Sequence, residues 1–315
     1  MRQLILILLF FSFSLVHGQI KCYVLPESDM VDGTIIRIDS FPTKLIQPRN
    51  VDVWLPKSYS KDKKYSVLYM HDGQNLFDKN TTWNNQEWKV DEVASKLIKE
   101  NVVKEFIVVG IHNIPQIRFL DLYPKKTFEY LSMNKKDSIF QSAKKREMNI
   151  TESNFNGDNY LKFIVEEVKP YIDETYSTLK NKEDTFVGGS SMGGLMSMYA
   201  ICEYPEIFGG AICISTHWPG MLPNEDKTIP NSFFSYLEKK IPSPKNHKFY
   251  FDFGTETLDQ YYPQYEETVN KLFKDKNYTS ENYKNLKFEG ENHSETSWQK
   301  RIDIPFKFMF KKKNK

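Results

Sequence analysis

The 315-residue chain is poor in cysteine and carries no excess of charge of either sign. Forty-three basic and 41 acidic side chains leave a formal net charge of +2, which argues against the clustered basic face of a nucleic-acid-binding protein. Three cysteines are too few, and odd in number, for a fold built on a disulfide framework. Cys202 and Cys213 lie in apolar sequence and are expected to be buried thiols, although a bridge between these two stays open.

Long hydrophobic runs are absent too, except at the start of the chain. Residues 4–16 are almost entirely apolar and follow the positively charged Arg2. The run leads into Val16-His17-Gly18, whose small or medium-sized residues suit cleavage by a signal peptidase. The run is too short to span a membrane comfortably. We therefore expect a signal peptide at 1–18, one domain at 19–315, and a secreted or periplasmic protein with no membrane span after the leader is cleaved.

The rest of the chain alternates between apolar strand-like runs and amphipathic helical patterns. The expected buried strands are 65–70, 106–111, 211–214, 248–253 and 285–289, and the expected helices are about 90–101, 159–175, 195–202, 263–274 and 297–310. Two alternating stretches, 34–38 and 51–55, predict an antiparallel edge. The pattern predicts an α/β fold with a mostly parallel central sheet and helices on both faces, whose ligands bind beyond the carboxyl ends of the strands.

Residues 115–156 differ from this pattern because they have no clear period and many charges. A segment of this length between two elements is expected to run over the sheet as an insertion. It is interpreted either as a lid or substrate-binding loop, or as a solvated insertion without a role in binding.

A strand, a tight turn and a helix follow one another at 185–202, with small residues in the turn. A serine at the apex of so sharp a turn needs a glycine two residues before it and another two residues after it. Ser191 meets this requirement with Gly189 and Gly193, whereas Ser190 does not because Met192 follows it at that offset. Ser191 is therefore the candidate nucleophile.

A serine hydroxyl needs a base to take its proton and an acid to orient that base. His293 is the candidate base because it follows the last strand and completes the order serine, acid, histidine that is typical of α/β-hydrolases. His217 is its competitor. The candidate acid is Asp259, with Glu256 as the alternative, since both follow the strand at 248–253.

Two backbone N–H groups are needed to hold the oxyanion that forms when a serine attacks an ester. One is expected from Met192, directly after the nucleophile and at the start of a helix. The other is expected from Gln74, which follows Gly73 in the loop after the strand at 65–70.

Several segments together resemble the Putative esterase family of α/β-hydrolases. They are 53–56, 68–73, 110–113 with Arg118, the Ser191 turn, and His293-Ser294-Glu295 with Trp298 and Arg301. The family includes feruloyl, acetylxylan and enterochelin esterases, S-formylglutathione hydrolase and mycolyltransferases. The resemblance implies hydrolysis of carboxylic esters through an acyl-enzyme, without a metal or a cofactor. Several members carry an aspartate where this chain has Thr257, so the choice between Asp259 and Glu256 stays open.

The sequence thus predicts an exported serine carboxylesterase with an α/β-hydrolase fold. Its substrate is expected to be a small-molecule or polysaccharide-linked ester, either an acyl ester of a polysaccharide or a siderophore lactone. Arg118, Trp88 and Trp218 are candidate pocket residues. The alternatives are a non-catalytic binding protein on a hydrolase scaffold and an acyltransferase that uses the same residues.

Overall fold

The computed structural model describes residues 20–26, 32–145, 147 and 149–312. The predicted signal peptide lies outside these residues and stays a prediction. The described strands form one sheet in the order β1-β2-β3-β5-β4-β6-β7-β8-β9. Their bounds are β1 Cys22–Val24, β2 Thr34–Phe41, β3 Arg49–Leu55, β4 Ser66–His71, β5 Phe106–Ile111, β6 Thr185–Ser190, β7 Gly210–Ile214, β8 Lys248–Phe253 and β9 Tyr283–Lys287.

The sheet is antiparallel at one end and parallel over the rest. β1, β2, β3 and β5 pair antiparallel in that order, while β5, β4, β6, β7, β8 and β9 pair parallel. The predicted antiparallel edge and mostly parallel centre are therefore confirmed. The loops that follow β4, β6, β7, β8 and β9 all leave the sheet at the same edge, where ligands bind in folds of this kind.

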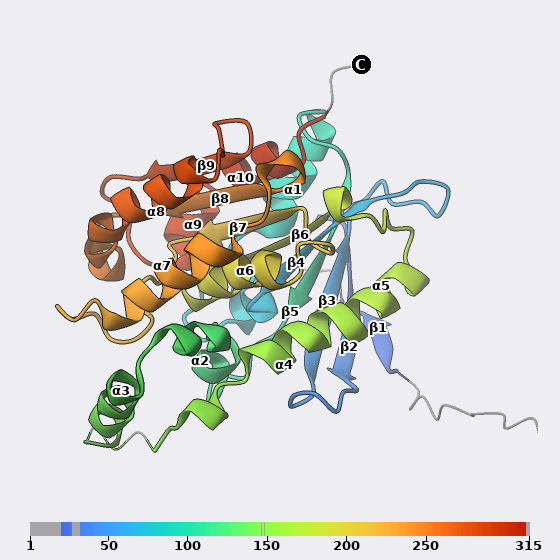
Figure 1. Cartoon of the computed structure of the whole chain (residues 1–315). Helices are drawn as coiled ribbons and strands as arrows, with labels where there is room; N and C mark the ends of the chain where they lie inside the picture. Colours follow the sequence, from blue (N-terminus) through green and yellow to red (C-terminus); the bar gives the residue numbers. More distant parts are fainter. Residues whose placement is uncertain (1–19, 27–31, 146, 148, 313–315) are drawn as a thin grey trace, which may run out of the picture.

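Helices cover both faces of the sheet, as predicted (Figure 1). The longer helices are α1 Val90–Lys99, α3 Met133–Lys145, α6 Met192–Glu203, α7 Thr228–Lys240 and α8 Pro263–Asp275, and the shorter ones are α2 Arg118–Asp121, α4 Gly157–Lys162, α5 Lys169–Thr175, α9 Glu295–Gln299 and α10 Asp303–Met309. Among the described residues, no helix has both the length and the apolar content needed to cross a membrane.

Alternating strand side chains divide the core into two layers. Val53 and Tyr69 belong to the layer under α4 to α8, whereas their neighbours Trp54 and Leu68 belong to the layer under α1, α9 and α10. Successive side chains of a strand point to opposite faces, and both faces are buried here. This burial on both sides explains why the parallel strands are continuous apolar runs.

Two proline positions explain two of the differences between the observed helices and the sequence prediction. The helix expected at about 297–310 is divided into α9 and α10, with Pro305 in the first turn of α10. A proline has no N–H to donate to the carbonyl of the residue four positions earlier, and its ring collides with the same carbonyl. One continuous helix is therefore disfavoured. The helix α7 was not predicted, because Pro230 resembles a loop residue; it lies in the first turn, where its missing N–H is tolerated.

The helix predicted at 159–175, with an interruption near Pro170, is also divided. A π-helical segment, Phe163–Val168, separates α4 from α5. Pro170 lies at the second position of α5, so the hydrogen bond to the carbonyl four residues earlier is missing at that point. The wider π turn accommodates this loss.

Candidate active site

Ser191 is the single residue between β6 and α6, and its backbone conformation is strained. Its φ of 57° and ψ of −120° are uncommon for a residue with a side chain. A Cβ on Gly189 would lie 3.0 Å from the backbone carbon of Gly193, so a side chain at position 189 would crowd the first turn of α6. Ser190, by contrast, is the buried last residue of β6. The structure therefore places Ser191 at the apex of the turn.

His293 and Asp259 meet in the loops that follow β9 and β8. The Nδ1 atom of His293 lies 2.5 Å from Oδ1 of Asp259, whose side chain is fully buried. The other oxygen, Oδ2, accepts a hydrogen bond of 2.6 Å from the backbone N–H of Gly254. Glu256 is exposed and begins the short helix that carries Asp259. The acid that contacts the predicted base is thus Asp259.

Ser215 is a member of this site that the sequence reasoning missed. Its hydroxyl donates to Oδ2 of Asp259 over 2.6 Å. It also accepts hydrogen bonds of 3.0 Å from the indole N–H of Trp298 and from Arg301. Its position directly after β7, at the functional edge of the sheet, is the signal that could have pointed to it. Ser215 therefore fixes the carboxylate that holds His293.

Arg301 also forms an ion pair of 3.0 Å with Asp252, and both side chains are almost wholly buried. Replacing Arg301 by methionine is expected to lower the free energy of unfolding by about 3–5 kcal/mol, because it leaves a buried carboxylate without its partner. Lys300→Met is the matched control: Lys300 pairs with Glu291 at the surface, and such pairs contribute less than about 1 kcal/mol. Urea unfolding of both variants measures the difference, and equal losses would contradict this account.

His217, the competing base, has both ring nitrogens occupied. Nε2 lies 2.9 Å from the carbonyl of Met221, and Nδ1 lies 2.9 Å from the hydroxyl of Tyr262. A carbonyl only accepts, so Nε2 carries the proton and Nδ1 accepts from Tyr262. Burial lowers the pKa of His217 to about 4, which keeps the ring neutral. These contacts leave His293 as the better candidate base.

Tyr262 joins the serine loop to the histidine loop. Its ring packs edge-on against that of His293, with 6.0 Å between the centroids. Burial raises the pKa of Tyr262 well above its usual value, and the nearby Ser191 side chain opposes that rise. Tyr262 thus contacts both His217 and His293, and it lies near Ser191.

The end of β4 lies close to the start of α6, since a Cβ on Gly193 would lie 3.3 Å from Cβ of His71. A Cβ on Gly73 would lie 2.4 Å from the backbone carbon of Gly110 in β5, so only glycine fits there. The left-handed residue of this turn is Asp72, with φ 59° and ψ 43°. Gln74 follows in a single 3₁₀ turn, Gly73–Asn75, and Met192 is the first residue of α6. The N–H groups at a helix start have no partner within the helix, which suits both residues to bind an anion.

The three predicted pocket residues lie elsewhere. Trp88 and Trp218 are buried in the two core layers, Trp88 against Trp298 and Trp218 against Phe234. Arg118 pairs with Asp72 through two hydrogen bonds, of 2.7 and 2.6 Å. None of the three belongs to the described lining of the cavity at Ser191.

That cavity has a volume of about 570 Å³ and includes Ser191, Met192 and His217 in its lining. Phe119 and several residues of α3, such as Ile139 and Ala143, form another part of the lining, so the insertion at 115–156 contributes to the wall. Figure 1 shows α3 at the periphery of the molecule, next to α2. The remaining lining, from residues 219–229 together with Leu258 and Tyr265, is mostly apolar.

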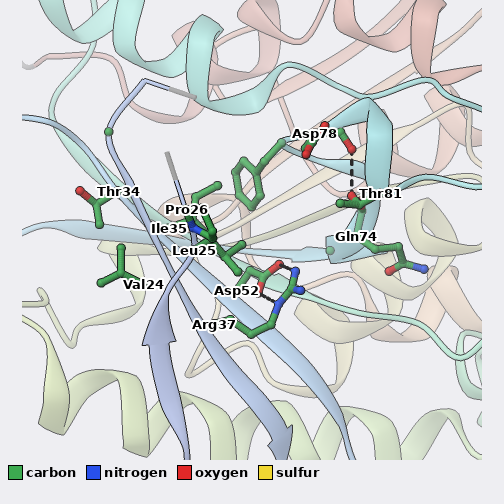
Figure 2. A pocket seen from close by; sticks show the side chains of 13 residues that line it. Val24, Leu25, Pro26, Thr34, Ile35, Arg37, Asp52, Gln74, Asp78 and Thr81 are labelled. Atoms are coloured by element: carbon green, nitrogen blue, oxygen red, sulfur yellow. Dashed lines mark hydrogen bonds and ion pairs between the residues drawn. The ribbon is translucent and has the colours of Figure 1, made fainter. Parts of the chain in front are cut away.

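A second cavity, of about 320 Å³, lies on the β1–β2 side of the loop that carries Gln74. Figure 2 shows Arg37 and Asp52 paired beside Gln74. Arg37 binds Asp52 through two hydrogen bonds, of 2.8 and 2.7 Å, and His112 contacts the same carboxylate over 2.7 Å. Because these charged groups satisfy one another, we assign no chemistry to this cavity.

Within the described ranges, no three His, Cys, Asp or Glu side chains gather in a way that could hold a metal ion. All three cysteines are free thiols, and Cys202 and Cys213 are buried as expected.

Solved structures of several esterases have a fold similar to that of this chain. A ferulic acid esterase is 17% identical with a TM-score of 0.61, over 89% of this chain and 98% of the other. The enterobactin esterase of Shigella flexneri is 14% identical with a TM-score of 0.62, over 90% of this chain and 60% of the other. At these identities the likeness concerns the fold, and it confirms the predicted α/β-hydrolase architecture.

Comparison with sequences gives the family. An endo-1,4-β-xylanase/feruloyl esterase of Xylanibacter ruminicola is 24% identical over 230 residues, which are 71% of this chain and 25% of that protein. An uncharacterized protein of Bacillus subtilis is 27% identical over 172 residues, 54% of this chain and 58% of the other. The chain therefore matches less than two thirds of the length of either relative. The family model described as Putative esterase matches residues 43–309, and the chain belongs to this family.

Proposed function

We propose that this protein is an exported serine carboxylesterase in which Ser191, His293 and Asp259 form the catalytic triad. The observation that carries the proposal is the 2.5 Å contact between His293 and the buried carboxylate of Asp259, at the same sheet edge as the strained Ser191 turn. Membership of the Putative esterase family supports the reaction class. Export rests on the predicted leader at 1–18.

The contact at Nδ1 sets the role of the imidazole. With Nδ1 donating to Asp259, Nε2 of His293 is free to accept the proton of Ser191 Oγ. Ser191 then attacks the ester carbonyl, and the Met192 and Gln74 N–H groups bind the resulting oxyanion. The protonated His293 returns its proton to the leaving alcohol as the C–O bond breaks, which leaves an acyl-enzyme. A water activated by His293 releases the acid and restores Ser191.

The cavity favours an uncharged and mainly apolar acyl group. Among the described residues that line it, the one charged side chain is Asp226, and it is exposed. Apolar side chains such as Ile139, Met221 and Leu258 make up much of the remainder. An anionic ligand such as an iron-loaded siderophore would find no cationic partner in this lining. An aromatic or aliphatic acyl group, by contrast, would bind favourably because its apolar surface would be removed from water. We therefore favour the polysaccharide acyl ester over the siderophore lactone.

A substrate series tests this preference. Ethyl ferulate and ethyl butyrate are expected to be hydrolysed with kcat/KM about tenfold or more above that of the monoethyl ester of succinic acid, because their apolar acyl groups gain from burial while the free carboxylate must lose its hydration. Steady-state assays of released acid measure the three values. Faster turnover of the anionic ester would contradict the preference.

Product analysis separates hydrolysis from acyl transfer. With p-nitrophenyl butyrate and an added alcohol acceptor, an esterase yields mainly butyric acid and a transferase mainly the new ester. A non-catalytic binding protein would yield neither, and its Ser191 would not react with a fluorophosphonate probe, since that reaction needs an activated hydroxyl.

A further inference from the structure

The loop that carries Gln74 brings a carboxylate to the place where the reaction would develop negative charge. Asp72 precedes Gln74 by two residues and is buried. Its Oδ2 atom lies 3.5 Å from the point where a Cβ of Gly193 would stand, in the first turn of α6. The neighbouring residue of that turn is Met192, the other oxyanion donor of the proposed function. A negative charge therefore lies beside the proposed oxyanion hole.

An unpaired carboxylate there would oppose catalysis. Like charges a few ångströms apart repel strongly when water is excluded. The carboxylate of Asp72 would also compete with the oxyanion for the N-terminus of α6, since the helix dipole favours any negative charge near its first turn. A group that cancels the charge of Asp72 would remove this penalty.

Arg118 is that group. Its Nε and Nη2 atoms bind the two oxygens of Asp72 over 2.7 and 2.6 Å, a bidentate arrangement. Asn113 donates a third hydrogen bond to Asp72, of 2.6 Å. Although burial alone would raise the pKa of Asp72, Arg118 and Asn113 hold it below its usual value. The carboxylate is thus ionised and neutralised by its partner rather than by a proton.

Arg118 is fixed in turn by the helix that it begins. At the other end of α2, Asp121 forms a buried ion pair of 2.8 Å with Arg49. Asn113 is also tied to the loop, because its backbone N–H donates to the side chain of Gln74 over 3.0 Å. The Nε and Nη2 donors of the guanidinium are therefore directed at Asp72, and Arg118 is not part of the described cavity lining.

We propose that Arg118 is a positioning residue which neutralises Asp72, so that the oxyanion forms beside a balanced ion pair instead of beside a bare carboxylate. This inference rests on the proposed function, because it concerns the same oxyanion hole. It replaces the expectation that Arg118 contacts the substrate.

Four variants test the proposal with p-nitrophenyl acetate: Arg118→Met, Arg118→Lys, Asp72→Asn and the double variant Arg118→Met/Asp72→Asn. Arg118→Met is expected to lower kcat about 100-fold, an effect of the size seen when one oxyanion donor is lost, with KM changed less than about threefold. The double variant should recover at least about tenfold of that loss, because it has no charge to neutralise. Asparagine also tolerates the left-handed backbone of position 72.

The two single replacements sharpen the test. Arg118→Lys keeps the positive charge without the fork geometry and should lie between wild type and Arg118→Met. Asp72→Asn removes the carboxylate and keeps the charge of Arg118, so its kcat should fall less than that of Arg118→Met. Thermal melting of all variants shows whether they are folded at the assay temperature.

Binding of phenylboronic acid gives a second readout that folding alone would not move. Boronic acids add to an active-site serine as a tetrahedral anion, so the affinity should fall in Arg118→Met and recover in the double variant in parallel with kcat. Equal losses in kcat for Arg118→Met and the double variant, or a rise confined to KM, would overturn the proposal. Failure of the proposed function is distinct: wild type itself would then be inactive, or Ser191→Ala would retain activity.

Discussion

Replacing Ser191 by alanine is expected to lower kcat on p-nitrophenyl acetate by about 10⁴- to 10⁶-fold, because the acyl-enzyme can no longer form. The loss should appear in kcat rather than in KM, since the alanine leaves the cavity unchanged. The residual rate reports what the Met192 and Gln74 N–H groups contribute without a nucleophile. Steady-state kinetics, supported by a fluorophosphonate labelling gel, measures the effect.

Ser190→Ala is the matched control. Ser190 has the same side chain one residue earlier, but it is buried at the end of β6 and does not adopt the strained conformation of Ser191. Its removal should leave kcat within about tenfold of wild type and leave labelling intact. If Ser190→Ala lost activity and labelling while Ser191→Ala kept them, the nucleophile would have been assigned to the wrong serine.

Replacing Asp259 by asparagine is expected to lower kcat by about 10⁴-fold. The amide oxygen can still accept from Ser215 and Gly254, which both donate to Oδ2. The amide group that then faces His293 stabilises the tautomer with a bare Nδ1, so Nε2 carries the proton and cannot take another from Ser191. The imidazolium formed during the reaction also loses its counter-charge.

Glu256→Gln serves as the comparison for this variant. Glu256 is exposed, so its replacement should leave kcat within about twofold of wild type. Measurement of kcat for both variants over pH 6 to 9 shows which of the two carboxylates orients His293. A collapse of activity in the Glu256 variant, with Asp259→Asn nearly unaffected, would overturn the assignment and would require the loop after β8 to rearrange.

The fold was predictable because the strands of a doubly covered sheet are continuous apolar runs. The strands at 106–111 and 248–253 were predicted at their observed bounds. The glycines at 189 and 193 were informative for a different reason: a Cβ at position 189 would crowd the backbone of Gly193, so their spacing marks the turn without knowledge of the rest. Where steric limits within a few residues restrict the type of amino acid, a single sequence is enough to predict the local structure.

Contacts between distant loops could not be predicted in the same way. Asp259 and Glu256 were hard to separate because the sequence does not tell which side of a short 3₁₀ helix faces the sheet. Trp88 and Trp218 resembled pocket residues, but large aromatic side chains serve equally well in a core, and that is where both lie. Ser215 was missed because its role depends on Trp298 and Arg301, more than 80 residues away.

The place of His293 at the rim of the sheet has a consequence for how the protein loses function on heating. His293 follows β9, the last strand of the described sheet, and the residues of β9 are only partly buried. Ser191 follows β6, in the middle of the same sheet, where every residue of the strand is buried. Opening of an outer strand costs less free energy than global unfolding. Detachment of β9 would therefore remove the base while the nucleophile stays in place, and activity would disappear in a local transition that precedes the cooperative loss of the fold.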